Sequence, residues 1–132
     1  MKTRVTGLGG FFFKTPDVRR LKDWYARHLG IPFSEHFDGW AFEWRDAAAP
    51  QTKGATVWSL FEQSNPYFEP GAASFMCNFR VADLDALLEA LTAEGVKVDP
   101  KREDGEFGRF AWIYDPDGNK VELWEPPAPA EN

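Results

Sequence analysis

The segment Gly10-Phe-Phe-Phe-Lys-Thr-Pro-Asp17 is followed 66 positions later by Met76-Cys-Asn-Phe-Arg-Val-Ala-Asp83. In both segments a run typical of a β-strand leads to an Asp. Each Asp precedes a stretch with helical spacing of apolar residues, and these stretches end at Gly30 and Gly95. The offset is half of the 132-residue chain, so two units of this size would fill it. The repeat therefore predicts a single domain made of two similar modules.

The composition is that of an ordinary globular protein, with 43% hydrophobic and 27% charged residues. An aromatic fraction of 16% is more than a small core needs, so we expect some rings to line a pocket or an interface. The net charge of −6, without a basic patch, argues against nucleic acid as a partner. No apolar run is long enough for a membrane span or a signal core, and Cys77 is the single cysteine. We therefore expect a cytoplasmic protein without disulfides or contact with a membrane.

In the first module, at about 5–61, we expect strands over 5–14, 32–37, 40–44 and 54–61. A helix should begin after the N-cap Asp17 and end at Gly30. Asp38-Gly39 is a typical hairpin turn, and we expect it to join the second and third strands. Residues 62–72 are rich in proline and glycine and are expected to form a linker.

In the second module, at about 74–125, we expect strands over 74–81, 96–98, 109–114 and 119–124 and a helix capped by Asp83. Residues 101–108 are charged and contain two glycines, which suggests a mobile flap. Asp115-Pro-Asp-Gly118 should form a turn, and residues 126–132 a frayed tail. The predicted order is strand–helix–strand–strand–strand, twice, which is an α+β fold.

Strand alternation predicts which side chains share a face of the sheet. The wholly apolar faces of the two repeated strands should pack on the helices, and the mixed faces should point into a cleft between the modules. The side chains that we expect to line this cleft, beside Gly10, are Phe12, Lys14, Met76, Asn78, Arg80, Glu122 and Trp124. Lys14 and Arg80 would place one cation in each half.

Several motifs resemble the vicinal oxygen chelate superfamily, which includes glyoxalase I, extradiol dioxygenases and bleomycin-resistance proteins. They are Thr15-Pro-Asp17 ahead of Trp24-Tyr25 and Leu29-Gly30, and above all Asp115-Pro-Asp-Gly-Asn-Lys-Val-Glu-Leu123. The resemblance covers residues 5–125. It implies two βαβββ modules that form a curved mixed sheet around a cleft. In many members that cleft holds a divalent metal, which chelates two oxygens of the substrate.

The resemblance places the four metal-ligand positions at Gly10, at Trp58 or Ser59, at Met76 and at Glu122. Glycine has no donor, a thioether suits a hard ion poorly, and Trp or Ser is no better. One carboxylate does not hold a catalytic divalent ion, which needs about three protein ligands. We therefore expect no cofactor. A divalent metal would require a rearranged site, such as Glu122 with His36 or Glu43.

Three hypotheses for function follow. The first is metal-free binding of a small anionic or aromatic molecule by Phe12, Lys14, Trp58, Met76, Asn78, Arg80, Glu122 and Trp124. The second is a metal-dependent lyase, isomerase or dioxygenase with a rearranged site that uses Glu122, or a metal-free acid–base enzyme. The third is an interaction module without a ligand, which a cleft filled by its own side chains would favour. The sequence leaves open whether the protein is an enzyme.

We also expect a homodimer, because the surplus of aromatic side chains needs cover. Trp40, Phe42 and Trp44 alternate with polar or small residues and form a one-sided aromatic ridge. This ridge would pack in the core or against a partner, or it would form the apolar wall of a ligand pocket. The sequence alone does not choose between these uses.

Overall fold

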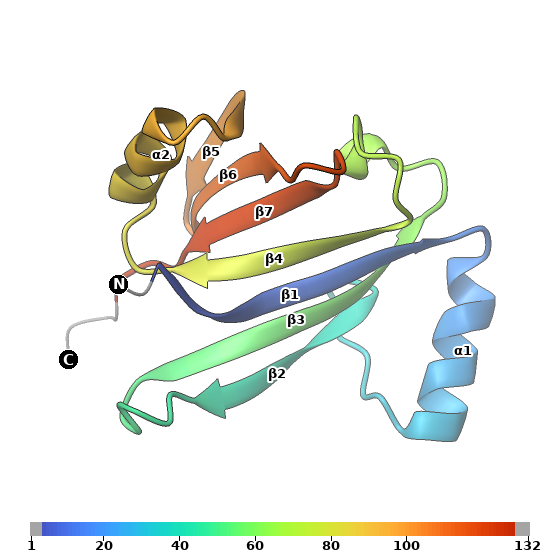
Figure 1. Ribbon diagram of the computed structural model, residues 1–132. Coiled ribbons are helices and arrows are strands. Elements are labelled where there is room, and N and C mark those ends of the chain that lie inside the picture. The colour runs from blue at the N-terminus through green and yellow to red at the C-terminus, as the bar shows by residue number, and fades with distance from the viewer. Residues whose placement is uncertain (1–3, 129–132) are drawn as a thin grey trace.

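The computed structural model describes residues 4–128 and contains one seven-stranded mixed sheet with the strand order β2-β3-β1-β4-β7-β6-β5 (Figure 1). The strands are β1 (Val5–Thr15), β2 (Gly39–Arg45), β3 (Lys53–Glu62), β4 (Phe75–Val81), β5 (Lys97–Gly105), β6 (Gly108–Tyr114) and β7 (Lys120–Glu125). The helices are α1 (Val18–Leu29), α2 (Leu84–Ala93) and the short 3-10 helix η1 (Pro66–Phe68). β1 pairs antiparallel with β4, so the two modules join within one chain. The predicted α+β fold with a curved mixed sheet is confirmed.

The second module has the predicted order of one strand, a helix and three strands, but the first module has one strand fewer. Residues 32–37 form no strand, so that prediction was wrong. The Ser34 N–H donates to the Gly39 carbonyl, and the Phe33 ring packs on Trp58 with 5.8 Å between ring centres. The segment thus turns back beneath α1 instead of extending. Gly39 begins β2, so Asp38-Gly39 joins no hairpin and that prediction was wrong as well. Residues 46–52 connect β2 to β3, which pair antiparallel.

The predicted flap at residues 101–108 is also wrong, because β5 continues through Gly105 and pairs with β6. One cation of the strand is ion-paired twice. The Arg102 guanidinium lies 2.6 Å from Asp85 and 2.9 Å from Asp104. The chain then reverses at Glu106-Phe107, and Gly108 has a φ of 115°, which a residue with a side chain rarely adopts. Ion pairing and a tight turn therefore replace the expected loop.

Both helices lie on the outer face of the sheet, defined here as the face that carries Phe13, Val81 and Leu123. The side chains of Asp17 and Asp83 cap the helices, as predicted, by accepting from the Arg20 and Ala86 N–H groups. α2 buries Leu84 and Leu87 against the outer face, whereas α1 buries only Val18 fully. Neither helix within residues 4–128 has the length and apolar character needed to cross a membrane.

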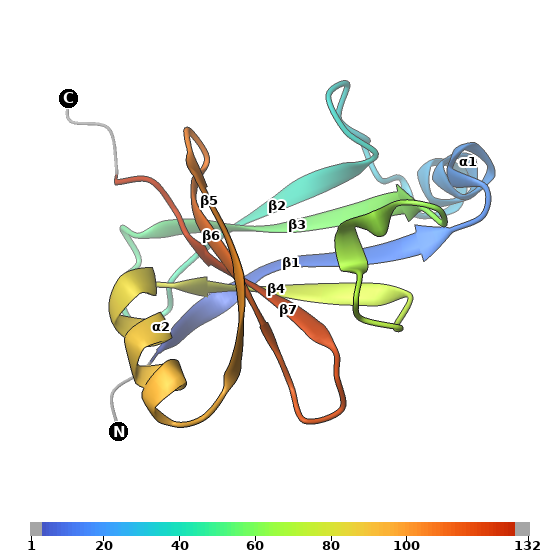
Figure 2. The ribbon, with the colours of Figure 1, turned by 90° about the horizontal axis from the view of Figure 1, so that it is seen from above.

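The predicted linker at 62–72 folds back onto the inner face, which is the opposite face and carries Phe12, Asn78 and Glu122. Figure 2 shows this light-green segment between β3 and β4 crossing the sheet. Phe68 is 1% exposed and packs with the buried side chains of Phe12, Met76 and Trp112. Lys120 Nζ donates to the Tyr67 carbonyl at 2.8 Å and anchors the segment to β7. This linker is therefore part of the core.

We expect Phe68→Ala to lower the free energy of unfolding by about 3–5 kcal/mol, because it leaves a cavity under a fully buried ring. Urea denaturation followed by far-UV circular dichroism measures this change. Phe107, which is 72% exposed, is the matched control, and Phe107→Ala should stay within about 0.5 kcal/mol. A loss below 1 kcal/mol for Phe68→Ala would show that the linker is not part of the core.

Candidate functional site

Glu122 is the most deeply buried ionisable side chain of the inner face, with 2% of its surface exposed. Three elements supply donors to its carboxyl. The Tyr67 hydroxyl from η1 donates to Oε1, and Trp112 Nε1 from β6 donates to the same oxygen at 3.2 Å. Asn78 Nδ2 from β4 donates to Oε2 at 2.5 Å. Burying a carboxyl lowers the stability of the fold unless hydrogen-bond partners surround it. The cluster therefore ties η1 to β4, β6 and β7 of the second module.

The surroundings of Glu122 favour its neutral form. Burial raises the pKa of Glu122, and the hydrogen bonds from Tyr67, Asn78 and Trp112, together with the charge of Lys120, oppose that rise. Burial also raises the pKa of Tyr67 and lowers the pKa of Lys120. Glu122 therefore takes up a proton more readily than a solvated glutamate does. Such a carboxyl can act as a hydrogen-bond donor as well as an acceptor.

Asn78 carries one unsatisfied atom in this cluster. The side chain is 3% exposed, and its Oδ1 has no hydrogen-bond partner among the described residues. Gly9 lies directly against Oδ1, and a Cβ at that position would collide with it. If the amide of Asn78 turned over, Oδ1 would face Glu122 and could accept from a protonated carboxyl. The cluster thus suits the neutral form of Glu122 as well as the charged one.

The inner face brings most of the predicted cleft residues together. Phe12 and Met76 lie in one apolar cluster with Phe68, and Asn78 and Glu122 are hydrogen-bonded. Lys14 Nζ lies 5.0 Å from the centre of the Phe68 ring. Each of these side chains is therefore engaged by a neighbour, and the aromatic rings of η1 occupy the space between them.

Trp58 does not lie on this face, so its predicted place in the cleft was wrong. Its ring packs against Tyr25 of α1, with 4.8 Å between ring centres, and against Phe13 at 5.6 Å. The reason is the register of the parallel β1–β3 pair, in which Phe11 lies opposite Trp58 and Phe12 opposite Ser59. Ser59, the alternative that the resemblance left open, is the β3 residue that shares the face of Phe12.

Arg80 and Trp124 lie apart from Glu122, at a hollow of about 270 Å³ that Glu43, Lys53 and Gly54 also line. We call it the smaller hollow. The Arg80 guanidinium lies 5.6 Å from the centre of the Trp44 ring, and Trp124 Nε1 donates to the Phe107 carbonyl at 2.8 Å. Lys14 and Arg80 therefore stack on different rings, and the structure gives no sign of a shared anion site between them.

The residues at the four implied metal-ligand positions do not fit a metal ion. A side chain at Gly10 would meet the Phe12 ring at 2.8 Å and the Val57 carbonyl at 2.9 Å. Met76 is 1% exposed and packed among aromatic rings, and Ser59 donates its hydroxyl to the Leu60 carbonyl. Within residues 4–128, the structure contains no group of three or more His, Cys, Asp and Glu side chains that could hold an ion.

A second hollow, of about 430 Å³, opens beside the Glu122 cluster, and we call it the larger hollow because it exceeds the one beside Arg80. It lies between η1 and the β5–β6 hairpin, and Tyr67, whose hydroxyl reaches Glu122, forms part of its wall. Two more rings and three carboxylates complete its lining: Glu103, Asp104, Glu106, Phe107 and Phe110, with Gly105. The Phe110 ring stacks on Trp124, with 6.3 Å between ring centres. Aromatic walls with a few convergent polar groups are typical of ligand sites.

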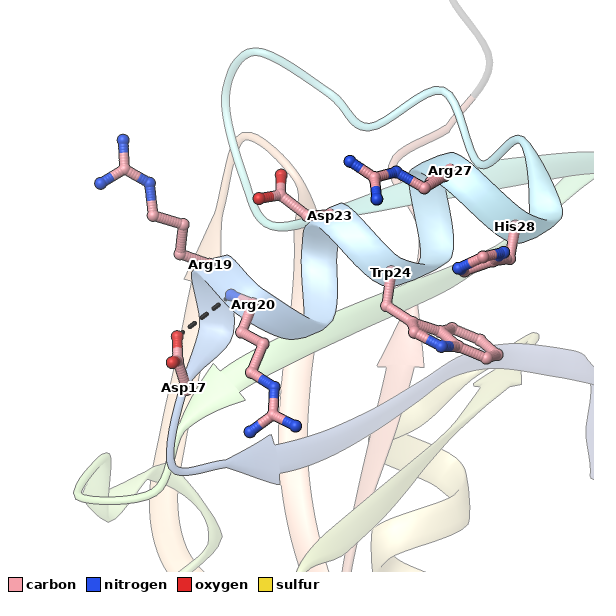
Figure 3. A pocket seen from close by; sticks show the side chains of 7 residues that line it. All are labelled: Asp17, Arg19, Arg20, Asp23, Trp24, Arg27 and His28. Atoms are coloured by element: carbon pink, nitrogen blue, oxygen red, sulfur yellow. Dashed lines mark hydrogen bonds between the residues drawn. The ribbon is translucent and has the colours of Figure 1, made fainter.

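The hollow of about 440 Å³ on α1 has a different character (Figure 3). Figure 3 shows its lining side chains spreading to both sides of the helix, with Arg19 and Arg27 on one side and Trp24 and His28 on the other. All of the lining belongs to α1 and its N-cap, and Trp24 is 49% exposed. This hollow shares no residue with the Glu122 cluster, and we do not take it as the functional site.

Tyr67, Trp112 and Phe110 are not among the side chains that were predicted to line the cleft. Two adjacent aromatic residues in a linker rich in proline and glycine were a signal that the linker is buried. Trp112 could have been found by counting outward from the turn at residues 115–118, because the β6–β7 hairpin places Trp112 opposite Glu122.

Two modules joined into one curved sheet, with three of the four implied metal-ligand positions filled by residues that are not usual metal ligands, define a glyoxalase-type domain. The model of the Glyoxalase/Bleomycin resistance protein/Dioxygenase superfamily matches residues 7–123. The chain belongs to this superfamily.

Solved structures with the same fold include methylmalonyl-CoA epimerases. The enzyme from Mycobacterium tuberculosis is 20% identical with a TM-score of 0.64, and the match covers 97% of this chain and 93% of that one. A variant of the Streptomyces coelicolor enzyme in complex with 2-nitronate-propionyl-CoA is 18% identical with a TM-score of 0.66, covering 94% and 99%. A hypothetical protein from Bacillus halodurans is 13% identical with a TM-score of 0.61, covering 96% and 98%. At these identities the likeness establishes the fold. No curated protein gives a significant match.

We expect Glu122→Gln to stabilise the protein above neutral pH relative to the wild type. The folded pKa of Glu122 is raised, so the wild type loses stability as the pH rises from about 4.3, the unfolded value, through the folded pKa. Each tenfold difference between the acid constants of Glu122 in the folded and unfolded states changes the free energy of unfolding by about 1.4 kcal/mol. Thermal unfolding of both proteins between pH 4 and 9 measures the difference.

The exposed Glu89→Gln is the matched control for this experiment and should show no such difference. A gap between wild type and Glu122→Gln that is the same at pH 4 and pH 9 would contradict the raised pKa.

Proposed function

We propose that this protein binds a small organic cation with an aromatic ring in the larger hollow, without a metal ion. The observation that carries the proposal is the hollow itself, whose walls combine the rings of Tyr67, Phe107 and Phe110 with carboxylates. Its volume of about 430 Å³ lies in the range of small-molecule sites. Tyr67 connects it to the buried carboxyl of Glu122.

The charge of the lining favours an amine over an acid. Asp104 is paired with Arg102 at 2.9 Å, whereas Glu103 and Glu106 form no ion pair within residues 4–128. Carboxylates next to aromatic faces attract an organic cation by charge and by cation–π contact. The expectation of an anionic ligand rested on Lys14 and Arg80, and neither side chain lines this hollow. We therefore still propose an aromatic ligand, but one with a positive charge instead of a negative charge.

An anionic aromatic ligand remains a second candidate, for the smaller hollow alone. Arg80 and Lys53 lie there beside the Trp124 indole, which would suit a ring that carries a carboxylate. Glu43 in the same lining opposes an anion, and the volume of about 270 Å³ is smaller. These two features place this candidate behind the first.

The fold supports binding more directly than catalysis. The likeness to a methylmalonyl-CoA epimerase in complex with 2-nitronate-propionyl-CoA indicates that a sheet of this shape can hold an organic ligand. Glu122, the acid–base candidate, is 2% exposed and its carboxyl already accepts three hydrogen bonds. Substrate could reach it only after Tyr67 moved. We therefore propose a binding protein, and a lyase, isomerase or dioxygenase stays the alternative.

The rings of η1 fill part of the inner face, which the hypothesis of an interaction module anticipated. The larger hollow nevertheless stays open beside them, and this is why we prefer a ligand-binding role. The cytoplasmic location stays a proposal that rests on composition.

We expect 2-phenylethylamine to bind more tightly than phenylacetate, which has a similar size and the opposite charge, in isothermal titration calorimetry. Phe110→Ala should weaken amine binding about tenfold, because it removes one aromatic wall. Glu103→Gln should also weaken it, and added salt should lower the wild-type affinity. Arg80→Gln, in the smaller hollow, is the control and should leave amine binding unchanged.

Tighter binding of phenylacetate that is lost in Arg80→Gln would transfer the site to the smaller hollow. Absence of binding by both probes, with intact folding, would remove the ligand-binding proposal in favour of an interaction module.

Elemental analysis of protein purified without chelators tests the metal-dependent alternative. Because three of the four implied ligand positions carry no suitable donor, we expect substoichiometric iron, manganese, nickel and zinc. Glu122→Ala should leave these amounts unchanged. Near-stoichiometric metal that is lost in Glu122→Ala would restore the enzyme hypothesis.

A further inference from the structure

The larger hollow and the smaller hollow share one wall. The Phe110 ring lines the larger hollow, and the Trp124 indole lines the smaller one. The two rings are stacked, with an interplanar angle of 14° and 6.3 Å between their centres. Trp124 Nε1 also donates to the carbonyl of Phe107, another wall residue of the larger hollow, at 2.8 Å. The two hollows therefore adjoin each other across this pair of rings.

The strand registers place this pair of rings in the middle of one row that crosses the sheet. Glu103 of β5 lies opposite Phe110, and Phe110 lies opposite Trp124 of β7. Trp124 in turn lies beside Arg80 of β4. Neighbours in register point to the same face of a sheet, so the row carries a carboxylate at one end, a guanidinium at the other and two rings between them. Three strand spacings, about 14 Å, separate the backbones of Glu103 and Arg80.

The two charged ends of the row have no counter-ion of their own. Among the residues that the structure describes, the Arg80 guanidinium and the Glu103 carboxylate take part in no ion pair. The Arg80 guanidinium lies 5.6 Å from the centre of the Trp44 ring. Stacking on a ring leaves the N–H groups in the plane of a guanidinium available to an acceptor. Both ends of the row can therefore receive a charged group of a ligand.

The linings of the two hollows have opposite charge. In the smaller hollow, Arg80 and Lys53 outnumber the one carboxylate, that of Glu43. The described lining of the larger hollow contains carboxylates and no cation, and Glu103 and Glu106 are the unpaired ones. A ligand with one charge complements only one of these hollows, whereas a ligand with a positive end and a negative end complements both.

We propose that the ligand is an aromatic zwitterion with its ammonium and its carboxylate at opposite ends, and that Arg80 recognises the carboxylate. The inference rests on the proposed amine site in the larger hollow and extends it across the pair of Phe110 and Trp124. The ammonium lies beside Glu103, the ring lies along the two stacked rings, and the carboxylate lies against the Arg80 guanidinium. A benzene ring with a charged group at each end, together with one ion-pair contact at each end, has a length similar to that of the row.

The position of the charges separates this class of ligand from ordinary amino acids. In free phenylalanine the ammonium and the carboxylate are attached to one carbon atom, so both would enter the same hollow. In the larger hollow the carboxylate would face Glu103 and Glu106, and like charges placed together select against such a ligand. A carboxylate on the far side of the ring reaches Arg80 instead, whose planar guanidinium matches the two carboxylate oxygens.

Isothermal titration calorimetry with three related probes tests the inference. The probes are 2-phenylethylamine, its derivative 4-(2-aminoethyl)benzoate, and phenylalanine, which is an isomer of that derivative. We expect 4-(2-aminoethyl)benzoate to bind about tenfold more tightly than 2-phenylethylamine, because it adds one hydrogen-bonded contact between charged groups. Phenylalanine should bind more weakly than 2-phenylethylamine, because its carboxylate enters the hollow that already holds carboxylates.

Two variants assign the ends of the ligand to the ends of the row. Arg80→Gln should abolish the advantage of 4-(2-aminoethyl)benzoate and leave the affinity for 2-phenylethylamine unchanged. Glu103→Gln should weaken the binding of both. The exposed Arg19 on α1 lines neither of the two hollows, so Arg19→Gln is the matched control and should change neither affinity. Circular dichroism checks that each variant is folded.

The results separate this inference from the proposed amine site. If 4-(2-aminoethyl)benzoate binds no more tightly than 2-phenylethylamine, or if its advantage persists in Arg80→Gln, the inference is overturned and the amine site stands. Binding of phenylalanine as tight as that of 4-(2-aminoethyl)benzoate would also overturn it, because the charges would then not need to be apart. If none of the three probes binds to the folded protein, the amine site and the inference both fail.

Discussion

The burial of the Glu122 carboxyl on the inner face is the constraint on which much of this structure depends. A carboxyl that is 2% exposed is tolerated only with hydrogen-bond partners, and here they come from η1, β4 and β6. Tyr67 reaches Glu122 only because the segment after β3 folds back over the sheet. Trp112 does so only because the β6–β7 register places it opposite. Satisfying one side chain therefore fixes the position of three elements.

The same constraint explains why the inner face does not resemble a metal centre. Phe68 enters with Tyr67 and packs on Phe12 and Met76, so apolar side chains occupy the space that ligand side chains would need. What remains open is divided into two hollows of different charge, one with carboxylates and one with Arg80 and Lys53. The carboxyl of Glu122 accepts hydrogen bonds from three donors, so it anchors the segments that supply them.

Local signals predicted the elements that are formed by local forces. The caps Asp17 and Asp83 and the faces of β1 and β4 followed from spacing and alternation, because those rules act within one segment. The wrong predictions concern segments whose structure depends on residues far away in the sequence. Residues 32–37 pack against Trp58 instead of pairing, and β5 is long because it pairs with β6 as far as Gly105. Whether Trp58 or Ser59 faces Phe12 depends on the register of a parallel pair, which alternation within β3 cannot supply.

The aromatic surplus that composition revealed divides into two groups with different surroundings. Phe12, Phe68 and Trp112 are buried and form the floor of the inner face, whereas Trp40 and Phe42 remain on an outer edge that the first module does not cover. The asymmetry between the modules produces this division. A fourth strand with proline and charges closes the second module, and the loss of its counterpart leaves β2 unprotected. The surplus of rings is therefore placed by the difference between the modules: rings under the linker are buried, and rings beside the uncovered edge stay exposed.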